Sequence, residues 1–278
     1  SSKTIEQAVQ VWQQLQAWQM ERHDTLIMFG GGMVCDLGGF VAATYKRGIH
    51  GVYCPTTLLS MIDAAYGGKT AVNLHHVKNC IGVVRQPDHV MPANTTFLQT
   101  LPMAELKSGF GEMIKYALIA SPLLLKQIND LEVLTPESVS PLWIQECVRI
   151  KENVVRKDPN DHHERHVLNF GHTIGHAIEG YYAASGRGVP HGVAVAAGLL
   201  YESLLSEKLT GLPHNEFLMI ENLIQRHFKV KPFSKKKWNV LLPYLIQDKK
   251  NKDGRINFTL LKGIGSPVTD VLVQDYPF

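Results

Sequence analysis

A short apolar run followed at once by three glycines constrains the fold more than any other feature of this sequence. Residues 25–29 (TLIMF) have the length and composition of a buried strand, Gly30–Gly32 follow, and residues 34–45 show helical spacing. A strand, a glycine turn and a helix in this order are typical of a parallel α/β sheet. A second short run, His50–Cys54, is closed by Pro55 and predicts the next strand.

The pattern changes near residue 100, and this change divides the chain. Helices are predicted over 4–20 and from Thr56 to the Gly67–Gly68 pair, whereas 87–102 reads as loop. Later periodic segments are mostly helical, at 103–118, 122–130, 136–157, 165–184, 191–210 and 214–228, with a late strand or hairpin at 256–265. We therefore expect an α/β domain at 1–100 and an α-helical domain at 101–278.

Composition narrows the class of protein. A chain of 278 residues with 45% hydrophobic residues can bury a core in one or two domains. The formal charge of +3 is too balanced for a general nucleic-acid or membrane-surface binder, although a local anion pocket stays possible. We find no membrane-spanning run and no signal peptide. The four cysteines show no CxxC spacing, which favours free thiols and a cytoplasmic location.

The glycine turn has two interpretations. Gly30–Gly32 can bring backbone N–H groups against a pyrophosphate at the start of the following helix. The motif is shorter than a full GxGxxG, however, and glycine turns also serve purely structural purposes. Asp36 can likewise be explained as a charge near the positive end of a helix. The turn alone therefore leaves nucleotide binding open.

Hydroxyl, carboxylate, amide and ammonium groups gather after the second strand. They belong to Thr56, Thr57, Asp63, Lys69, Lys78 and Asn79. This mixture suits a polyhydroxylated, anionic ligand, because such a ligand needs donors and acceptors at many positions and lysine binds phosphate as a point charge. The alternative is a capped helix with solvated lysines.

Three histidines and a glutamate form the most informative constellation. His172 and His176 lie four residues apart on one helical face, His191 begins a later helix, and Glu112 lies upstream. Imidazole and carboxylate ligands suit zinc or another borderline divalent ion. No glutamate follows His172 as in HExxH, which disfavours a zinc protease, and isolated histidines on helices are often structural.

Several other charged residues are open to simple explanations. Lys115 lies three residues after Glu112, as in an ordinary surface ion pair. Lys151 and Arg165 flank a polar loop. The lysines of 248–252 resemble a solvated cluster, although one of them could reach an anion pocket. Aromatic residues are too sparse among these charges for a nucleic-acid surface.

Six blocks resemble the 3-dehydroquinate synthase family of sugar phosphate cyclases. They are GGGMVCDLGGFVAATYKRG, PTTLLSMIDAAYGGKTAVN, VKNCIG, GEMIKYALI, LNFGHTIGHAIE and PHGVAVAAG, and the likeness runs from residue 3 to about 265. The resemblance implies a Rossmann-like NAD-binding α/β domain, an all-α metal-binding domain, an active site between them and a homodimer. Family members also carry an initial strand, helix and strand that this sequence lacks, so we expect an incomplete adenosine pocket here.

The resemblance also implies residue roles. Glu112, His172 and His191 correspond to the ligands of zinc, with cobalt as a possible substitute, and His176 becomes a substrate partner instead of a ligand. Implied substrate contacts are Asp63, Lys69, Asn79, Lys115, Lys151, Arg165, Asn169, His176 and Lys250, with Arg47 reaching the neighbouring subunit's substrate phosphate. Implied cofactor contacts are Gly32, Met33, Val34, Cys35, Asp36, Thr56, Thr57, Lys69, Lys78, Phe97, Leu98, Gln99 and Thr100.

Members of this family convert 3-deoxy-D-arabino-heptulosonate 7-phosphate to 3-dehydroquinate and phosphate, a carbon–oxygen lyase reaction of the shikimate pathway for aromatic amino acids. NAD is consumed and regenerated in each turnover. Three alternatives stay open: a sister cyclase such as 2-deoxy-scyllo-inosose or 2-epi-5-epi-valiolone synthase, a metal-dependent alcohol or glycerol dehydrogenase that releases NADH, and a non-catalytic binding module. Arg165, Asn169 and His176 favour the first expectation, because they suit a substrate with both carboxylate and phosphate.

Overall fold

The computed structural model describes residues 3–75, 77–246, 251 and 254–274, which form two compact units. The first unit comprises 1–102 together with 139–152, and the second comprises 103–138 together with 153–278. Each unit has its own hydrophobic core. The first unit's N-terminal segment ends at Pro102, and the sequence predicts a boundary near residue 100.

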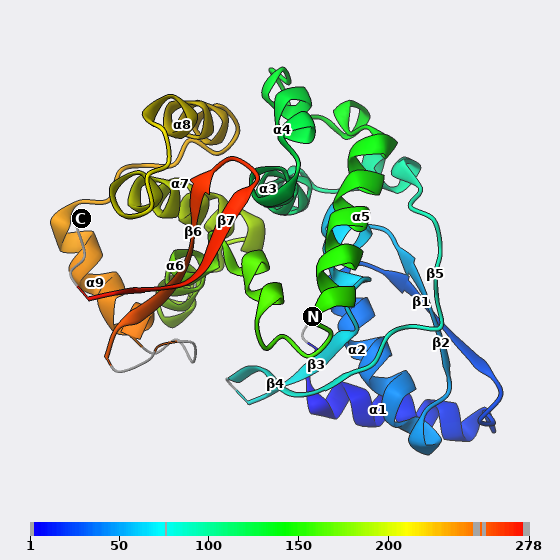
Figure 1. The fold of residues 1–278 in the computed structure, drawn as a ribbon. Helices are drawn as coiled ribbons and strands as arrows, with labels where there is room; N and C mark the ends of the chain where they lie inside the picture. Colours follow the sequence, from blue (N-terminus) through cyan, green and yellow to red (C-terminus); the bar gives the residue numbers. More distant parts are fainter. Residues whose placement is uncertain (1–2, 76, 247–250, 252–253, 275–278) are drawn as a thin grey trace. The chain divides into compact units, whose positions relative to one another are not determined.

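A parallel sheet forms the centre of the first unit, as the glycine turn predicts. Its strands β1 (Thr25–Gly30), β2 (His50–Pro55) and β5 (His89–Val90) are ordered β1-β2-β5. β1 and β2 pair in parallel from Thr25↔His50 to Gly30↔Pro55, so their carboxyl ends are level. The helix α2 (Gly32–Thr44) follows the turn directly and packs on both strands, as Figure 1 shows.

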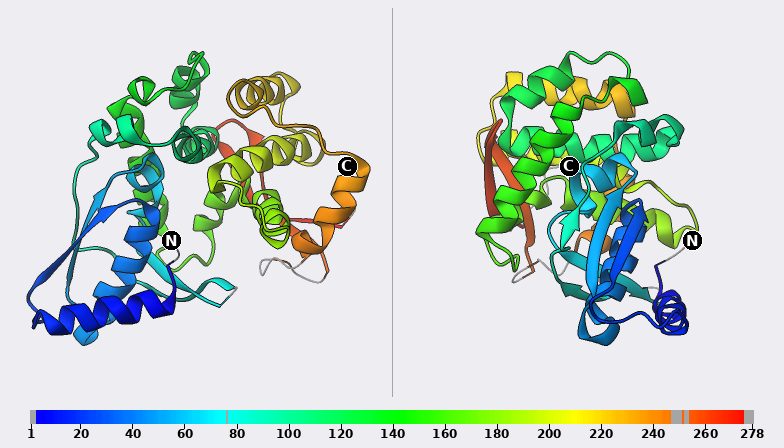
Figure 2. Two further views of the ribbon diagram at one scale, coloured as in Figure 1. Left: turned by 180° about the vertical axis from the view of Figure 1, so that it is seen from behind. Right: turned by 90° about the vertical axis from the view of Figure 1, so that its right-hand side faces the viewer.

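The predicted first helix is confirmed as α1 (Ile5–Ala17), which begins where the Thr4 side chain accepts a hydrogen bond from the backbone N–H of Gln7. Apolar residues of α1 and α2 form one core, in which the rings of Trp12 and Phe40 lie 5.9 Å apart. Figure 2 draws both helices in blue, and α2 lies against the strands in both views.

The structure corrects the segment after β2. The predicted helix shrinks to a short π-helical segment, η2 (Ser60–Ala64), and the chain then forms a hairpin of β3 (Lys69–Leu74) and β4 (Val77–Val84) that was not predicted. Gly67 and Gly68 end the helix as expected, with φ of 101° and 68°. Two 3₁₀ segments, η1 (Tyr45–Arg47) and η3 (Thr95–Thr100), complete the unit.

Helices dominate the second unit, as predicted. Its helices are α3 (Met103–Ala120), α4 (Pro122–Asn129), α6 (His172–Ala184), α7 (His191–Leu209), α8 (His214–Phe228) and α9 (Lys235–Ile246). The end of α5 (Pro141–Lys157) also belongs to this unit, whereas residues 141–152 of α5 belong to the first unit. Two helices begin later than predicted and follow 3₁₀ segments, η4 (Pro136–Ser138) and η5 (Glu164–Asn169). The positive φ of Gly171, 81°, separates η5 from α6. The helix α9, which begins with three consecutive lysines, was not predicted.

The late hairpin is confirmed and covers the helical core. β6 (Ile256–Gly263) and β7 (Ser266–Val273) pair antiparallel, and β6 packs on α7. Ile256, Phe258 and Leu260 join apolar residues of α6, α7 and α9 in one buried cluster. In Figure 1 the hairpin is the pair of red arrows. Among the described residues, no helix combines the length and apolar character needed to cross a bilayer.

Candidate functional site

Glu112, His172 and His191 come together within the second unit. Glu112 lies in the middle of α3, whereas His172 and His191 are the first residues of α6 and α7. The Nε2 atoms of His172 and His191 lie 3.4 Å and 3.3 Å from Oε1 of Glu112. One ligand atom from each residue lies within 4.8 Å of the others, which is a spacing that one metal ion can bridge.

Glycines beside the three residues explain why their helices approach so closely. A Cβ on Gly192 would lie 1.7 Å from the carbonyl oxygen of Ser108, and one on Gly111 would lie 2.2 Å from that of Gly192. A Cβ on Gly198 would similarly lie 1.9 Å from the carbonyl oxygen of Gly171. Since real Cβ atoms do not approach so closely, only glycine lets α7 touch both α3 and the start of α6.

The Glu112 carboxylate is the electrostatic centre of this group. It is completely buried, and the equally buried ammonium of Lys115 lies 2.5 Å away. Burial alone would raise the Glu112 pKa, but Lys115, His172 and His191 outweigh it and hold that pKa well below its usual value. The i,i+3 ion pair expected on a surface is therefore present but buried.

A divalent cation fits this geometry. Neither oxygen of Glu112 receives a well-directed hydrogen bond from the described residues, although three nitrogen atoms lie within 3.4 Å. An ionised carboxylate that is buried without donors is costly, and a cation shared with two imidazoles would remove that cost. Two histidines and one glutamate also form the ligand set of known catalytic zinc sites, which keep a further coordination position open.

The two histidine rings differ in charge preference. Burial lowers the pKa of His172 well below its usual value, which favours the neutral ring that a metal requires. Burial opposes charge on His191 too, but the carboxylates of Glu112 and Glu179 raise its pKa to about 10. The Nδ1 atom of His191 lies 3.2 Å from Oε2 of Glu179.

His176 lies beside the group without joining it. Its ring centroid is 5.3 Å from that of His172 and 6.1 Å from that of His191. Its possible ligand atoms group with those of Glu179 and His191, not with Glu112. Spacing along α6 alone suggested a His172–His176 pair, whereas in the structure His172 groups with Glu112 and His176 groups with Glu179.

A buried carboxylate that the sequence analysis missed caps the start of α6. The Glu202 side chain on α7 is fully buried and accepts hydrogen bonds from the backbone N–H groups of Gly171 at 2.6 Å and Ile174 at 3.0 Å. The first N–H groups of a helix lack partners within the helix, so this carboxylate satisfies two of them. It thereby fixes the turn that begins with His172.

Arg165 and Asn169 lie in η5, just before α6. Arg165 is buried and donates from Nη1 to the carbonyl of Pro159. Its loop is held by Asp158, whose carboxylate accepts backbone hydrogen bonds from His162, His163 and Arg165 at 2.7 to 3.1 Å. These hydrogen bonds lower the Asp158 pKa strongly, because they stabilise the ionised form.

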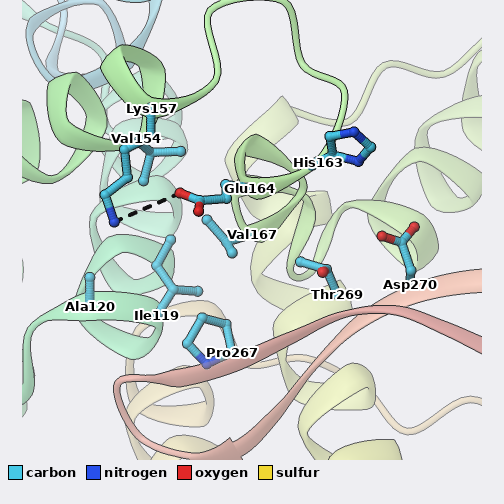
Figure 3. A pocket seen from close by; sticks show the side chains of 10 residues that line it. All are labelled: Ile119, Ala120, Val154, Lys157, His163, Glu164, Val167, Pro267, Thr269 and Asp270. Atoms are coloured by element: carbon cyan, nitrogen blue, oxygen red, sulfur yellow. Dashed lines mark ion pairs between the residues drawn. The ribbon is translucent and has the colours of Figure 1, made fainter.

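A pocket of about 420 Å³ lies next to this loop, but none of the expected site residues lines it. Figure 3 shows its apolar side chains, among them Ile119, Val154 and Pro267, and an ion pair across it between Lys157 and Glu164 at 3.7 Å. We therefore do not assign this pocket to the substrate.

In the first unit, Asp63 and Lys151 meet. Lys151 lies on the part of α5 that belongs to this unit, and Asp63 lies on η2. The ammonium of Lys151 pairs with the Asp63 carboxylate and donates to the Asp63 carbonyl at 2.9 Å. Lys151 is buried and Asp63 half-buried, so two expected substrate residues far apart in sequence form one charged pair.

The glycine turn meets the end of β2. The backbone N–H of Thr56 donates to the Gly30 carbonyl at 3.0 Å, and a Cβ on Gly31 would lie 2.8 Å from the Thr57 side chain. The turn is thus a close backbone approach, as a pyrophosphate cradle requires. The Asp36 carboxylate pairs with Lys3, and burial nevertheless raises its pKa.

The other expected cofactor and substrate residues differ in exposure. Met33, Lys69, Lys78, Asn79, Gln99, Thr100 and Arg47 are exposed, Val34 and Phe97 are half-buried, and Cys35 and Leu98 are buried. Phe97 packs edge-on against Phe29 of β1 at 5.3 Å. Lys250 lies outside the described residues.

Lys3, Asp158, Glu179 and Glu202 were not among the expected site residues. Glu179 could have been found, because it shares one face of α6 with His172 and His176 at i+7 and i+3. Asp158 precedes a polar loop, which is a usual place for a loop-capping carboxylate. Glu202 gave no signal, since a single acidic residue in an apolar helix does not reveal its partner.

The sequence matches known proteins over most of its length. Family models described as 3-dehydroquinate synthase N-terminal and C-terminal match residues 1–108 and 109–251. The 3-dehydroquinate synthase of Parabacteroides distasonis is 39% identical over 258 residues, which cover 92% of this chain and 72% of the relative.

Solved structures of sister cyclases show the same fold. A 2-epi-5-epi-valiolone synthase of Streptomyces hygroscopicus subsp. jinggangensis 5008, with NAD⁺ and Zn²⁺ bound, aligns with a TM-score of 0.85 at 25% identity, covering 99% of this chain and 76% of that one. A 2-deoxy-scyllo-inosose synthase complexed with carbaglucose-6-phosphate, NAD⁺ and Co²⁺ aligns with a TM-score of 0.82 at 26% identity, covering 98% and 76%.

Proposed function

This chain belongs to the 3-dehydroquinate synthase family, and we propose that it converts 3-deoxy-D-arabino-heptulosonate 7-phosphate to 3-dehydroquinate and phosphate. The observation that carries the proposal is the meeting of Glu112, His172 and His191 on three helices, within blocks that match this family along the chain. The enzyme is a lyase that uses NAD and a divalent metal, as the bound groups of its structural neighbours support.

Glu112, His172 and His191 would hold the divalent ion. When bound, the ion supplies Lewis acidity toward substrate hydroxyl groups. The chain's own contribution is to fix three ligands in a buried place, where the Lys115 ammonium lies 2.5 Å from the Glu112 carboxylate. This ammonium keeps Glu112 ionised, and we assign it a second role as a donor to the substrate.

Gly32–Asp36, Thr56, Thr57, Lys69, Lys78 and Phe97–Thr100 would hold NAD. When bound, the nicotinamide accepts a hydride and returns it within the same turnover. The close contact of Gly31 with Thr57 supports this assignment, because it places the turn and the strand end within reach of one ligand.

The remaining polar residues would orient the substrate. Lys151, Arg165 and His176 supply donors for its phosphate and carboxylate, while Asp63, Asn79 and Asn169 supply polar contacts to its hydroxyls. Such groups act by holding the reacting carbon atoms in position more than by moving protons. The burial of Arg165 and Lys151 supports fixed, directional roles.

We assign residues 1–100 to the NAD-binding domain and 101–278 to the metal- and substrate-binding domain. We further propose a homodimer in which Arg47 reaches the substrate phosphate of the neighbouring subunit. Arg47 is exposed, and the left-handed φ angles of Lys46 and Arg47, 46° and 66°, support a strained loop that presents this side chain outward. The free state of all four cysteines supports a cytoplasmic location.

The decisive experiment incubates the protein with NAD, Zn²⁺ and the heptulosonate phosphate, and scores phosphate release together with a cyclic product by mass spectrometry. We expect both in equal amounts and no rise in absorbance at 340 nm. A steady rise would favour a dehydrogenase, and turnover of uncarboxylated sugar phosphates alone would favour a sister cyclase. Absence of any product with intact NAD binding in calorimetry would favour a binding module.

A further inference from the structure

The His191 ring lies between two carboxylates. Its Nε2 atom is 3.3 Å from Oε1 of Glu112, and its Nδ1 atom is 3.2 Å from Oε2 of Glu179. A neutral imidazole carries one N–H, whereas ionised carboxylates only accept. The neutral ring can therefore donate a hydrogen bond to only one of the two carboxylates. Its other nitrogen faces the second carboxylate with a lone pair, and this contact is favourable only if a cation lies between them.

We propose that Glu179 is a positioning residue that orients His191 as a metal ligand. Its carboxylate accepts the hydrogen of Nδ1, which leaves the Nε2 lone pair directed toward Glu112 and the ion. This inference rests on the metal site of the proposed function and adds a residue to it. Outer partners of this kind fix the tautomer and orientation of a ligating histidine and raise its basicity.

His172 supplies an independent parallel. Its Nδ1 atom lies 3.1 Å from the carbonyl oxygen of Phe170, and its Nε2 atom faces the same Glu112 oxygen as that of His191. A carbonyl oxygen only accepts, so Nδ1 of the neutral His172 ring carries the hydrogen. Both histidines therefore present Nε2 to Glu112 and have an acceptor behind Nδ1.

The local fold gives Glu179 this place. His172, His176 and Glu179 share one face of α6, and this face meets the first residue of α7. The Glu179 side chain is only 17% exposed, which strengthens its interaction with the ring relative to a surface pair. α6 therefore supplies one ligand of its own and the orienting group for another.

A different interpretation is that Glu179 itself ligates a second ion, because possible ligand atoms of His176, Glu179 and His191 also lie within 4.8 Å of one another. That arrangement would need both ring nitrogens of His191 to bind metal at once, and His176 is exposed. The hydrogen-bond distance between Nδ1 and Glu179 favours an orienting role, and metal stoichiometry distinguishes the two.

The test measures metal affinity of the full chain, stripped of metal and titrated with Zn²⁺ against a chromophoric chelator. Glu179→Gln keeps the shape but loses the charge, and Glu179→Ala loses the acceptor. We expect affinity to fall about 10-fold in the first and up to about 100-fold in the second, with one ion bound in each. The visible absorption spectrum of the Co²⁺-loaded variants should indicate the same ligand set as in the wild type. The variants should need a higher Co²⁺ concentration to reach saturation.

Glu207→Gln is the matched control. Glu207 accepts from Nδ1 of His214 at 2.7 Å in a similar pair near the end of α7. Its loss should leave metal affinity unchanged. Melting of the metal-free proteins checks folding, and ¹⁵N NMR of the zinc-loaded wild type should show hydrogen on Nδ1 of His191, a result that needs no variant.

Each outcome decides the matter. Unchanged affinity in Glu179→Gln, or hydrogen on Nε2 in the loaded wild type, overturns the inference. Two ions in the wild type and one in Glu179→Gln also overturn it, because Glu179 would then be a ligand. Failure of the wild type itself to bind Zn²⁺ refutes the metal site of the proposed function, which is a separate result.

Discussion

Single charged side chains make the sharpest tests of the proposed substrate contacts. Arg165→Ala and Lys151→Ala each remove a buried cation whose bonds to a charged group are worth about 1.5–3 kcal/mol. We therefore expect kcat/KM to fall roughly 10- to 100-fold in each variant, measured by phosphate release. Arg149→Ala is the control, because Arg149 pairs with Glu146 on an exposed part of α5. Full turnover in either buried variant would contradict these roles.

Cysteine reactivity tests the local environment of the glycine turn. Cys35 is 1% exposed, and burial raises its pKa to about 12, whereas Cys80 is exposed. Since the thiolate is the reactive form, a raised pKa and burial both slow alkylation of Cys35. We expect iodoacetamide at pH 8 to label Cys80 first and Cys35 only after unfolding, as peptide mass spectrometry can show. Early labelling of Cys35 in the folded protein would contradict the packing of α2.

At the scale of one helix, Glu202 controls the start of α6. Glu202→Ala leaves two buried N–H groups without partners, at about 1–3 kcal/mol each. We expect Tm to fall by roughly 4–24 °C, because a destabilisation of 1 kcal/mol lowers Tm by about 2–4 °C in a chain of this size. Zinc affinity should also fall, since His172 begins this helix. Glu207→Ala, near the end of α7, should change neither quantity.

The loop before α6 gives a pH-dependent prediction. The Asp158 pKa is lowered in the folded state, so its stabilising effect is present above the unfolded pKa, about 3.9, and is lost as pH falls below it. Asp158→Asn removes this effect. We expect wild type to have the higher Tm at pH 7 and the difference to shrink toward pH 3. A difference that is constant with pH would show that the carboxylate charge is not the cause.

Elements with a clear period were predictable, and those defined by distant contacts were not. β1 and α2 follow from the apolar run and the glycines, and most helices follow from their spacing. The β3–β4 hairpin was not predicted. Buried residues, Thr70 and Val72, alternate with more exposed ones in β3, but this short pattern begins directly after the Gly67–Gly68 pair, which by itself indicates only the end of a helix. The late starts of α5 and α6 were missed because 3₁₀ turns keep a nearly helical period.

The site was predictable in its ligands but not in its support. Glu112, His172 and His191 could be named from residue type and resemblance, whereas their meeting depends on glycine contacts of α7 with α3 and with the start of α6. Glu179 shares a face of α6 with His172 and His176, but its hydrogen-bond partner His191 lies on α7, and Glu202 of α7 bonds the start of α6, so spacing along one helix does not indicate either partner. Tertiary packing decides such roles.

At the scale of the whole chain, zinc and NAD should protect different segments. A ligand at 100 times its Kd stabilises the state that binds it by about 2.7 kcal/mol, so hydrogen exchange that needs the site to open should slow roughly 100-fold. We expect Zn²⁺ to slow exchange at the start of α6 and around Glu112 and His191, and NAD to slow it at residues 30–36 and 56–58. Mass spectrometry after pulse labelling measures both. In Glu112→Gln the zinc effect should vanish while the NAD effect persists. If zinc instead protected the glycine turn in this variant, the metal would bind outside the ligands named above, and the separation of the two ligands between the units would be wrong.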